Sequence, residues 1–244
     1  CKHASVRAQA ERWLGVHGKP AGLAPLLKDS SALVRRNAVE SAARFWGDPA
    51  AKPLIEAVFD LASTTDRRLR HAIIASLAHL DPKCLPKAKT AGEKIVRGWV
   101  LAKKTARGQP PAESLALGLA VLADKDTGTE DQLDALRLLN AAFDRLEAGE
   151  DPRYATFDTQ WGRVDLSGHQ GATAQTLAAI AGLVRAGDHR IAIEARRLAG
   201  KLGSGSAGIA SRMAADTSAS SAAADDIFLL SSLARLNRQC SADT

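Results

Sequence analysis

Aromatic residues make up only 4% of this 244-residue chain, and long apolar runs are missing. Because β-strands favour aromatic and β-branched side chains, this scarcity, together with abundant alanine, argues against sheets and favours closely packed helices. No apolar run reaches 18 residues, so we expect no membrane insertion, and no segment has the pattern of a signal peptide. The overall balance, 45% hydrophobic and 25% charged residues, is that of a folded globular protein.

Cysteine is also rare, and the three cysteines, Cys1, Cys84 and Cys240, form no CxxC or CxxCH motif. The sequence therefore predicts neither a zinc site nor a haem attachment site. The chain opens at Cys1 without an initiator methionine, and a helical pattern starts at the third residue. We interpret it as an excerpt or a processed product; a lipid-modified N-terminal cysteine is the alternative, but such a cysteine usually precedes a tether.

Charge is distributed unevenly along the chain. Residues 1–107 carry 20 Lys and Arg against 9 Asp and Glu, a net charge of +11, whereas residues 108–244 carry 13 against 18, a net charge of −5. The basic half is expected to attract nucleic acid, an acidic protein or an anionic surface, because summed charge steers association without specifying the partner.

The basic half contains an internal repeat. Three segments place an aliphatic residue before an arginine, with small or apolar residues four and eight positions later: SVRAQAERWLG, LVRRNAVESAARF and RLRHAIIASLAHL. This spacing defines one face of a helix. The pairs Val6-Arg7, Val34-Arg35 and Leu69-Arg70 recur after 28 and then 35 residues, and a second amphipathic segment precedes each later copy. Two helices per period indicate a solenoid, in which each pair is stable only against its neighbours.

Turn residues support this division. Gly47-Asp48-Pro49 and Asp81-Pro82 are predicted to end one helix and begin another, since proline suits only the first turn of a helix. Asp29-Ser30-Ser31 and Thr64-Thr65-Asp66 offer N-cap oxygens before two of the arginine-bearing helices.

The pattern of aspartate followed by Val-Arg or Leu-Arg on the second helix of each pair resembles HEAT-type repeats. The resemblance covers about residues 3–107 and implies an all-α fold, a HEAT-like α-solenoid forming a right-handed superhelix of irregular helix pairs. In that family the arginine commonly pairs with an acidic residue of a neighbouring repeat. The resemblance therefore implies structural roles for Arg35 and Arg70 with Asp29 and Asp66.

Beyond residue 107 the repeat becomes irregular. We expect regular basic repeats over residues 1–107 and a less regular helical array over 108–244. The second part contains an inserted loop at 150–171 and a Ser/Ala/Gly-rich segment at 203–224, which is either a flexible connector or a weak helix.

A second resemblance comes from this part. WGRVDLSGHQGAT, IEARRLAG and DDIFLLSSLARL, together with LRHAIIASL upstream, are similar to the helical segment of large secreted bacterial proteins. Those proteins join a quinoprotein-dehydrogenase-like propeller, HEAT-type repeats and a C-terminal cytochrome c module, and their redox chemistry lies outside the helical segment. The resemblance alone implies an extracytoplasmic location, periplasmic or secreted, and a connecting role between neighbouring domains.

The insert at 150–171 is the first candidate site, because long loops in compact arrays are often functional. A partner-binding interpretation assigns apolar anchors and polar contacts to Tyr154, Trp161, Arg163, Asp165 and His169. The competing interpretation is a structural plug in which Phe157, Trp161, Val164 and Leu166 fill the groove between helix pairs. A metal or acid/base pair of Asp165 and His169 is disfavoured, since their spacing aligns them only on a helix and the neighbouring glycines oppose one.

A basic face is the second candidate. Six side chains near the starts of two predicted helices are expected to lie on one side of the array: Arg35, Arg36, Arg67, Arg68, Arg70 and His71. Three uses remain open: salt bridges between repeats with a solvated face, binding to an acidic protein, or contacts with phosphates as in HEAT-like DNA glycosylases.

No catalytic motif is present, neither GxSxG, a phosphate loop nor GxGxxG. The sequence therefore predicts a non-catalytic scaffold or protein-interaction segment with no metal and no cofactor. Its expected partners are neighbouring domains of a parent polypeptide or another protein. The alternative function is nucleic-acid binding, of the DNA glycosylase type, through the basic N-terminal half.

Overall fold

The computed structural model describes residues 2–106, 111–144, 146, 166, 168–203, 207–214, 229–230 and 232–233. Within these residues every regular element is an α-helix or a 3₁₀ helix, which confirms the predicted all-α class. The chain forms two compact units, Cys1–Lys104 and Thr105–Thr244, close to the division expected after residue 107.

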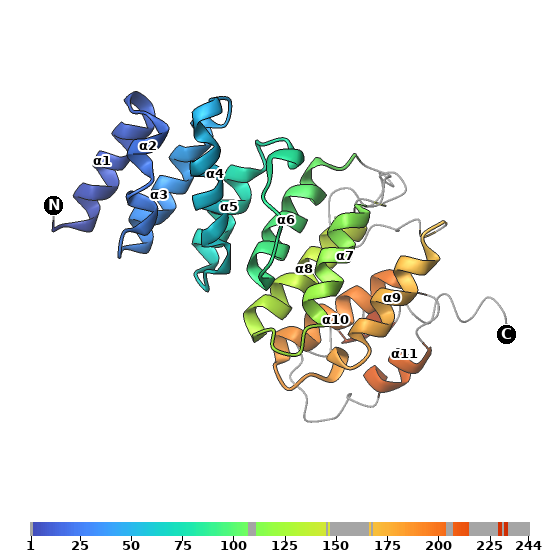
Figure 1. Ribbon diagram of the computed structural model, residues 1–244. Helices are drawn as coiled ribbons and strands as arrows, with labels where there is room; N and C mark the ends of the chain where they lie inside the picture. Colours follow the sequence, from blue (N-terminus) through green and yellow to red (C-terminus); the bar gives the residue numbers. More distant parts are fainter. Residues whose placement is uncertain are drawn as a thin grey trace, which may run out of the picture. The chain divides into compact units, whose positions relative to one another are not determined.

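The first unit consists of two rows of helices (Figure 1). One row holds the arginine-bearing helices, and α3 packs between α1 and α5: α1 (Ala4–His17), α3 (Ala32–Ala42), α5 (Arg67–Leu77) and α6 (Ala91–Lys104). The other row is built from shorter pieces: α2 (Pro20–Leu23), η1 (Leu26–Lys28), η3 (Pro49–Ala51), α4 (Lys52–Asp60), η4 (Leu61–Ser63) and η5 (Pro82–Cys84).

Aspartates cap three of these elements, at positions that the turn residues predict. The Asp66 carboxylate accepts hydrogen bonds from the backbone N–H groups of Arg68 and Leu69 at the start of α5, at 2.9 and 3.1 Å. Asp48 and Asp81 cap η3 and η5 in the same way. These bonds satisfy N–H groups that have no partner inside a helix.

The start of α3 differs from the expectation. Ser31 is its N-cap residue, but its side chain makes no capping bond. The Asp29 carboxylate instead accepts from the Ser31 N–H at 2.8 Å and from the guanidinium of Arg7. The nearest acidic side chain therefore joins two repeats and does not cap the helix.

A continuous apolar core holds the two rows together. Val34, Ala38, Leu69, Ile73 and Leu77 lie on the arginine-bearing helices and are almost completely buried. Leu54, Val58 and Phe59 face them from α4. Because alanine occupies several contact positions, the stacked helices approach closely, as the composition predicts.

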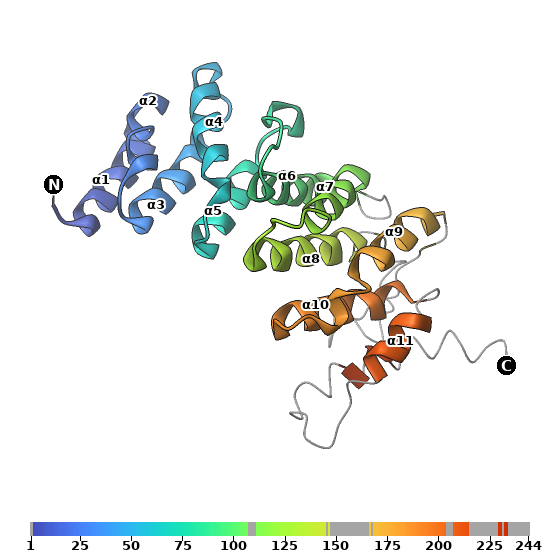
Figure 2. The same ribbon diagram turned by 60° about the horizontal axis from the view of Figure 1, so that its bottom comes forward.

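The second unit has its own core and repeats the two-row arrangement with longer helices (Figure 2). Helix α8 (Thr129–Asp144) packs against α10 (His189–Leu202), and α7 (Ala112–Leu122) contacts both α8 and α9 (Gln170–Ile180). The 3₁₀ helix η7 (Leu183–Arg185) links α9 to α10, and α11 (Ala207–Ala214) packs on η7. Helix α11 lies within the Ser/Ala/Gly-rich segment at 203–224.

Two valines at equivalent repeat positions test how the first unit is stabilised. Val34→Ala removes apolar volume from a fully buried side chain of α3, so we expect the free energy of unfolding to fall by roughly 2 kcal/mol. Val6→Ala, at the same position of α1, changes a half-exposed side chain and should cost less than about 0.5 kcal/mol. Urea denaturation followed by circular dichroism measures both, and equal losses would contradict this packing.

Candidate functional site

The arginines of the first unit divide into a structural group and an exposed group. Arg7, in the structural group, forms a contact between the first two repeats. The Arg7 guanidinium donates two hydrogen bonds to Asp29, from Nε to Oδ2 at 2.7 Å and from Nη2 to Oδ1 at 2.8 Å. This bidentate geometry is among the strongest that a carboxylate forms. The hydrogen bond from Arg7 is the main cause that lowers the pKa of Asp29 to about 2, aided by the Ser31 N–H.

Arg35 also reaches the Asp29 turn, but through the backbone. Its Nη1 donates to the carbonyl oxygens of Asp29 and Ser30, at 2.7 and 3.1 Å. The family resemblance pointed to a carboxylate partner for Arg35, and the contact is with a carbonyl because Arg7 occupies that carboxylate. Arg35 therefore fastens α3 to the turn that precedes it.

The same device recurs in the next two repeats. Arg70 is 4% exposed, and its Nη2 donates to the Thr64 carbonyl oxygen at 2.7 Å. The carboxylate suggested for Arg70, that of Asp66, caps α5. In α6, Arg97 donates to the carbonyls of Leu85 and Pro86, at 3.2 and 3.1 Å. Val96-Arg97 is thus a further copy of the aliphatic–arginine pair, which the sequence analysis missed.

The other residues of the basic face lie nearer to solvent. Arg36 is partly exposed and forms an ion pair with Glu40 one turn later, with its Nε 3.6 Å from Oε1. Arg67, Arg68 and His71 are exposed at the start of α5. The structure therefore presents three of the six predicted side chains to solvent near one helix N-terminus, while Arg35 and Arg70 serve the repeat itself.

In the second unit, ion pairs join α8 to α10 along their length. Glu130 pairs with Arg190 at 2.7 Å, Arg137 with Glu194 at 3.3 Å, and Asp144 with Lys201. Ion pairs between repeats were expected in the basic half. The second unit has them at three successive positions along α8 and α10. The charges on these facing helices are largely used within the unit.

Most of the predicted binding insert lies outside the described residues, namely Tyr154, Trp161, Arg163 and Asp165. His169 is described: it is the N-cap residue of α9, and its side chain makes no capping bond. Its carbonyl accepts a hydrogen bond from the Thr173 hydroxyl at 3.0 Å. Neither the binding nor the plug interpretation of the insert is tested by these contacts.

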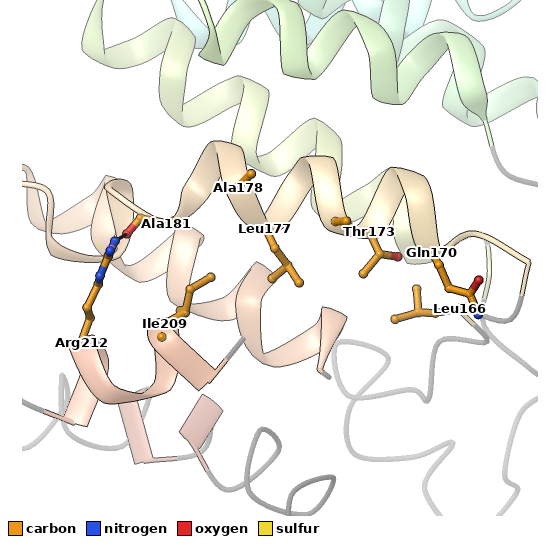
Figure 3. Close-up of a pocket in the computed structure, with 10 residues that line it drawn as sticks. Leu166, Gln170, Thr173, Leu177, Ala178, Ala181, Ile209 and Arg212 are labelled. Carbon is orange, nitrogen blue, oxygen red and sulfur yellow. Dashed lines mark hydrogen bonds between the residues drawn. The ribbon is translucent and has the colours of Figure 1, made fainter. Parts of the chain in front are cut away.

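A shallow groove of about 540 Å³ runs along α9, beside the end of the insert. Leu166, Leu177 and Ile209 give it an apolar floor, and Figure 3 shows Leu177 of α9 on the side of that helix where Ile209 of α11 lies. Arg212 lies at one end, where its Nη1 donates to the Ala181 carbonyl at 2.9 Å. The groove contains no titratable pair that would support acid/base chemistry among its lining residues.

Metal-ligating side chains are likewise not clustered in the part of the chain that the structure describes. No group of three or more His, Cys, Asp or Glu side chains is placed to hold a metal ion there. Among the same residues, no helix has the length and apolar character needed to cross a bilayer.

Comparison with known proteins gives one family match within the first unit. Residues 20–91 match a family model described as HEAT repeats. The crystal structure of an engineered protein aligns with 90% of this chain and 96% of its own, with 14% sequence identity and a TM-score of 0.44. No curated protein matches the sequence. The HEAT-like solenoid class predicted from the sequence is confirmed by the helical structure together with this family match.

Asp29→Asn tests the contact between the first two repeats. Because the Asp29 pKa is lowered in the folded state, its carboxylate stabilises the protein above the unfolded-state pKa, and this contribution is lost as pH falls toward about 2. We expect the variant to be less stable than wild type at pH 7, with the difference shrinking between about pH 4 and about pH 2.

Thermal unfolding at a series of pH values measures this difference. Asp60→Asn is the matched control, since Asp60 is exposed on α4, and it should leave the pH profile unchanged. A difference between Asp29→Asn and wild type that is constant across this pH range would show that Asp29 acts by packing and not by charge.

Proposed function

We propose that this chain is a non-catalytic HEAT-like scaffold whose first unit binds an acidic protein surface through the exposed cations of α5. The observation that supports this proposal is that Arg67, Arg68 and His71 are exposed together at the start of one helix. They lie in a half with a net charge of +11, which favours encounter with a negatively charged partner.

The contacts of the other arginines in the basic face favour a protein partner over a nucleic-acid partner. A duplex is held by many phosphate contacts spread along its backbone, and each neutralised phosphate adds to the binding energy. Arg35 and Arg70 are bonded to backbone carbonyls, and Arg36 has a carboxylate neighbour. Of the six side chains of the basic face, Arg67, Arg68 and His71 remain exposed together at the start of α5, and this grouping suits an acidic loop or helix better than a strand of regularly spaced phosphates.

The scaffold is further proposed to be a connecting segment of a larger bacterial extracytoplasmic protein with dehydrogenase-like and cytochrome c-like modules. Support comes from the resemblance of WGRVDLSGHQGAT and DDIFLLSSLARL to such proteins. The stacked helix pairs of each unit provide stiff spacers of the kind that such a connection needs. Reading the gene on both sides of this sequence tests the idea, and the absence of both a propeller and a CxxCH module would remove its support.

Charge reversal tests the basic patch directly. Arg67→Glu/Arg68→Glu should weaken binding to a model acidic polypeptide, poly-L-glutamate, by at least about tenfold at low salt, because attraction becomes repulsion. Binding is measured by fluorescence anisotropy with labelled polyglutamate and, in parallel, with a labelled DNA duplex. The control is Lys52→Glu/Lys83→Glu, which reverses two exposed cations on the other row of helices.

Each outcome bears on one function. Tighter binding of polyglutamate than of DNA, lost in the arginine double variant only, supports an acidic protein partner. Tighter binding of DNA, with an affinity that falls steeply as salt increases, would favour the nucleic-acid alternative. Equal losses in both double variants would show that net charge acts without a defined patch.

A further inference from the structure

Glu11 is an acidic side chain buried between two stacked helices. It lies on the inner side of α1 with Ala8 and Gly15, and it is 0% exposed. Neither oxygen of its carboxyl group has a hydrogen-bond partner among the described residues. Because a buried carboxylate without partners is costly, this environment favours the uncharged, protonated form of the group.

Glu11 also departs from the pattern of the repeat. The same position, five residues after the aliphatic member of each aliphatic–arginine pair, holds Val39 in α3, Ile74 in α5 and Leu101 in α6. Val39 and Ile74 are 0% and 8% exposed. Three repeats therefore fill this position with a hydrocarbon side chain, so packing between the helices does not require an acid there.

Helix α3 is polar where it faces Glu11. The Asn37 side-chain amide donates to the Ala8 carbonyl at 3.5 Å, and the Ser41 side chain lies against Gly15. Glu11 lies between Ala8 and Gly15 along the same side of α1, so it faces the gap between Asn37 and Ser41. Asn37 is 4% exposed, and its Oδ1 has no donor among the described residues. A proton on Glu11 would supply one.

The next pair of stacked helices lacks both polar groups. Val39 of α3 and Ala72 of α5 occupy the positions of Glu11 and Asn37, and both are buried. The acid and the amide thus occur together between α1 and α3, and hydrocarbon side chains replace both between α3 and α5. This joint replacement indicates that Glu11 and Asn37 act as a pair.

Nearby charges do not remove the cost of burying Glu11. Burial is the main cause that raises its pKa, and Glu40 of α3 acts in the same direction. The Ser41 hydroxyl, Arg12 of α1 and Arg44 of α3 oppose the rise, but the pKa stays above its usual value. Helix α2, which also packs on α1, contains no ionisable residue.

We propose that the α1–α3 contact is a pH-sensitive joint, which tightens when Glu11 is protonated and can donate to Asn37, and loosens when that proton is lost. Because the pKa of Glu11 is raised in the folded state, the folded chain holds this proton at pH values where the unfolded chain has released it. Stability therefore falls as pH rises from about 4.5 through the pKa of the folded state, and it levels off above that pKa.

Asp29 gives the same joint the opposite response. Its pKa is lowered to about 2, so its bond with Arg7 persists in mild acid and is lost only in stronger acid. The two responses together make the joint tightest at about pH 4 to 5, where Glu11 is protonated and Asp29 is still ionised. The proposal does not involve the exposed cations of α5 and does not depend on them.

Local opening of α1 tests the joint in the full chain. Hydrogen exchange of the α1 amides, expressed as protection factors to remove the intrinsic effect of pH, reports how often this helix leaves α3. We expect protection to fall at least about tenfold between about pH 5 and about pH 8, since one unit of pKa displacement corresponds to a tenfold change. Equal protection at both pH values would overturn the proposal.

Variants assign the response to one group. Glu11→Gln keeps the size of the side chain and a donor toward Asn37 but cannot ionise, so its protection should change by less than about twofold over the same range. Glu11→Val, which copies the residue of α3 at this position, should behave in the same way. Glu56→Gln is the matched control, because Glu56 is exposed on α4, and it should retain the wild-type fall. A fall that persists in Glu11→Gln would assign the response to another group of α1, such as His17, and would reject Glu11 as its source.

Carboxyl-carbon NMR of the full chain labelled at glutamate observes the group itself. The resonance that is missing from the Glu11→Gln spectrum should titrate above about pH 4.5, the ordinary value for glutamate. Titration of that resonance at or below about pH 4.5 would show a solvated or paired carboxylate and would also overturn the proposal.

Discussion

The interaction on which the repeats depend is a hydrogen bond from an arginine to the carbonyls that end the preceding turn. Helix ends leave carbonyl oxygens without partners, and the shorter row of elements consists mainly of such ends. Arg35, Arg70 and Arg97 supply the missing donors in the first unit, and Arg196 does the same for the Val184 carbonyl in the second. In Arg35 and in Arg97 a single Nη1 atom donates to two carbonyls at once.

Because arginines are used in this way, the net charge of the sequence does not show how much positive charge the surface presents to a partner. A net charge of +11 suggests an extended basic face, yet two of its members, Arg35 and Arg70, are bonded to backbone carbonyls of turns. Arg7, outside that face, pairs with Asp29. In the second unit the acidic excess is partly offset between α8 and α10 in the same manner. At the start of α5, by contrast, Arg67, Arg68 and His71 remain exposed to solvent.

The helices and their order could be predicted from the sequence because apolar spacing and aspartate caps are local signals. The partner of each arginine could not, since Asp29 has two competing donors and only the packed structure decides between Arg7 and Arg35. The aliphatic–arginine pair at Val96-Arg97 was not predicted, because the helical segment that precedes it is only the short 3₁₀ helix η5. The insert residues Tyr154, Trp161, Arg163 and Asp165 keep the status of predictions.

The stacked order of the first unit also bears on its synthesis. Each later helix of the long row emerges from the ribosome with a neighbour already made, so α3 can settle on α1, α5 on α3, and α6 on α5. The unit can therefore gain packing step by step as the chain lengthens, without waiting for its last helix.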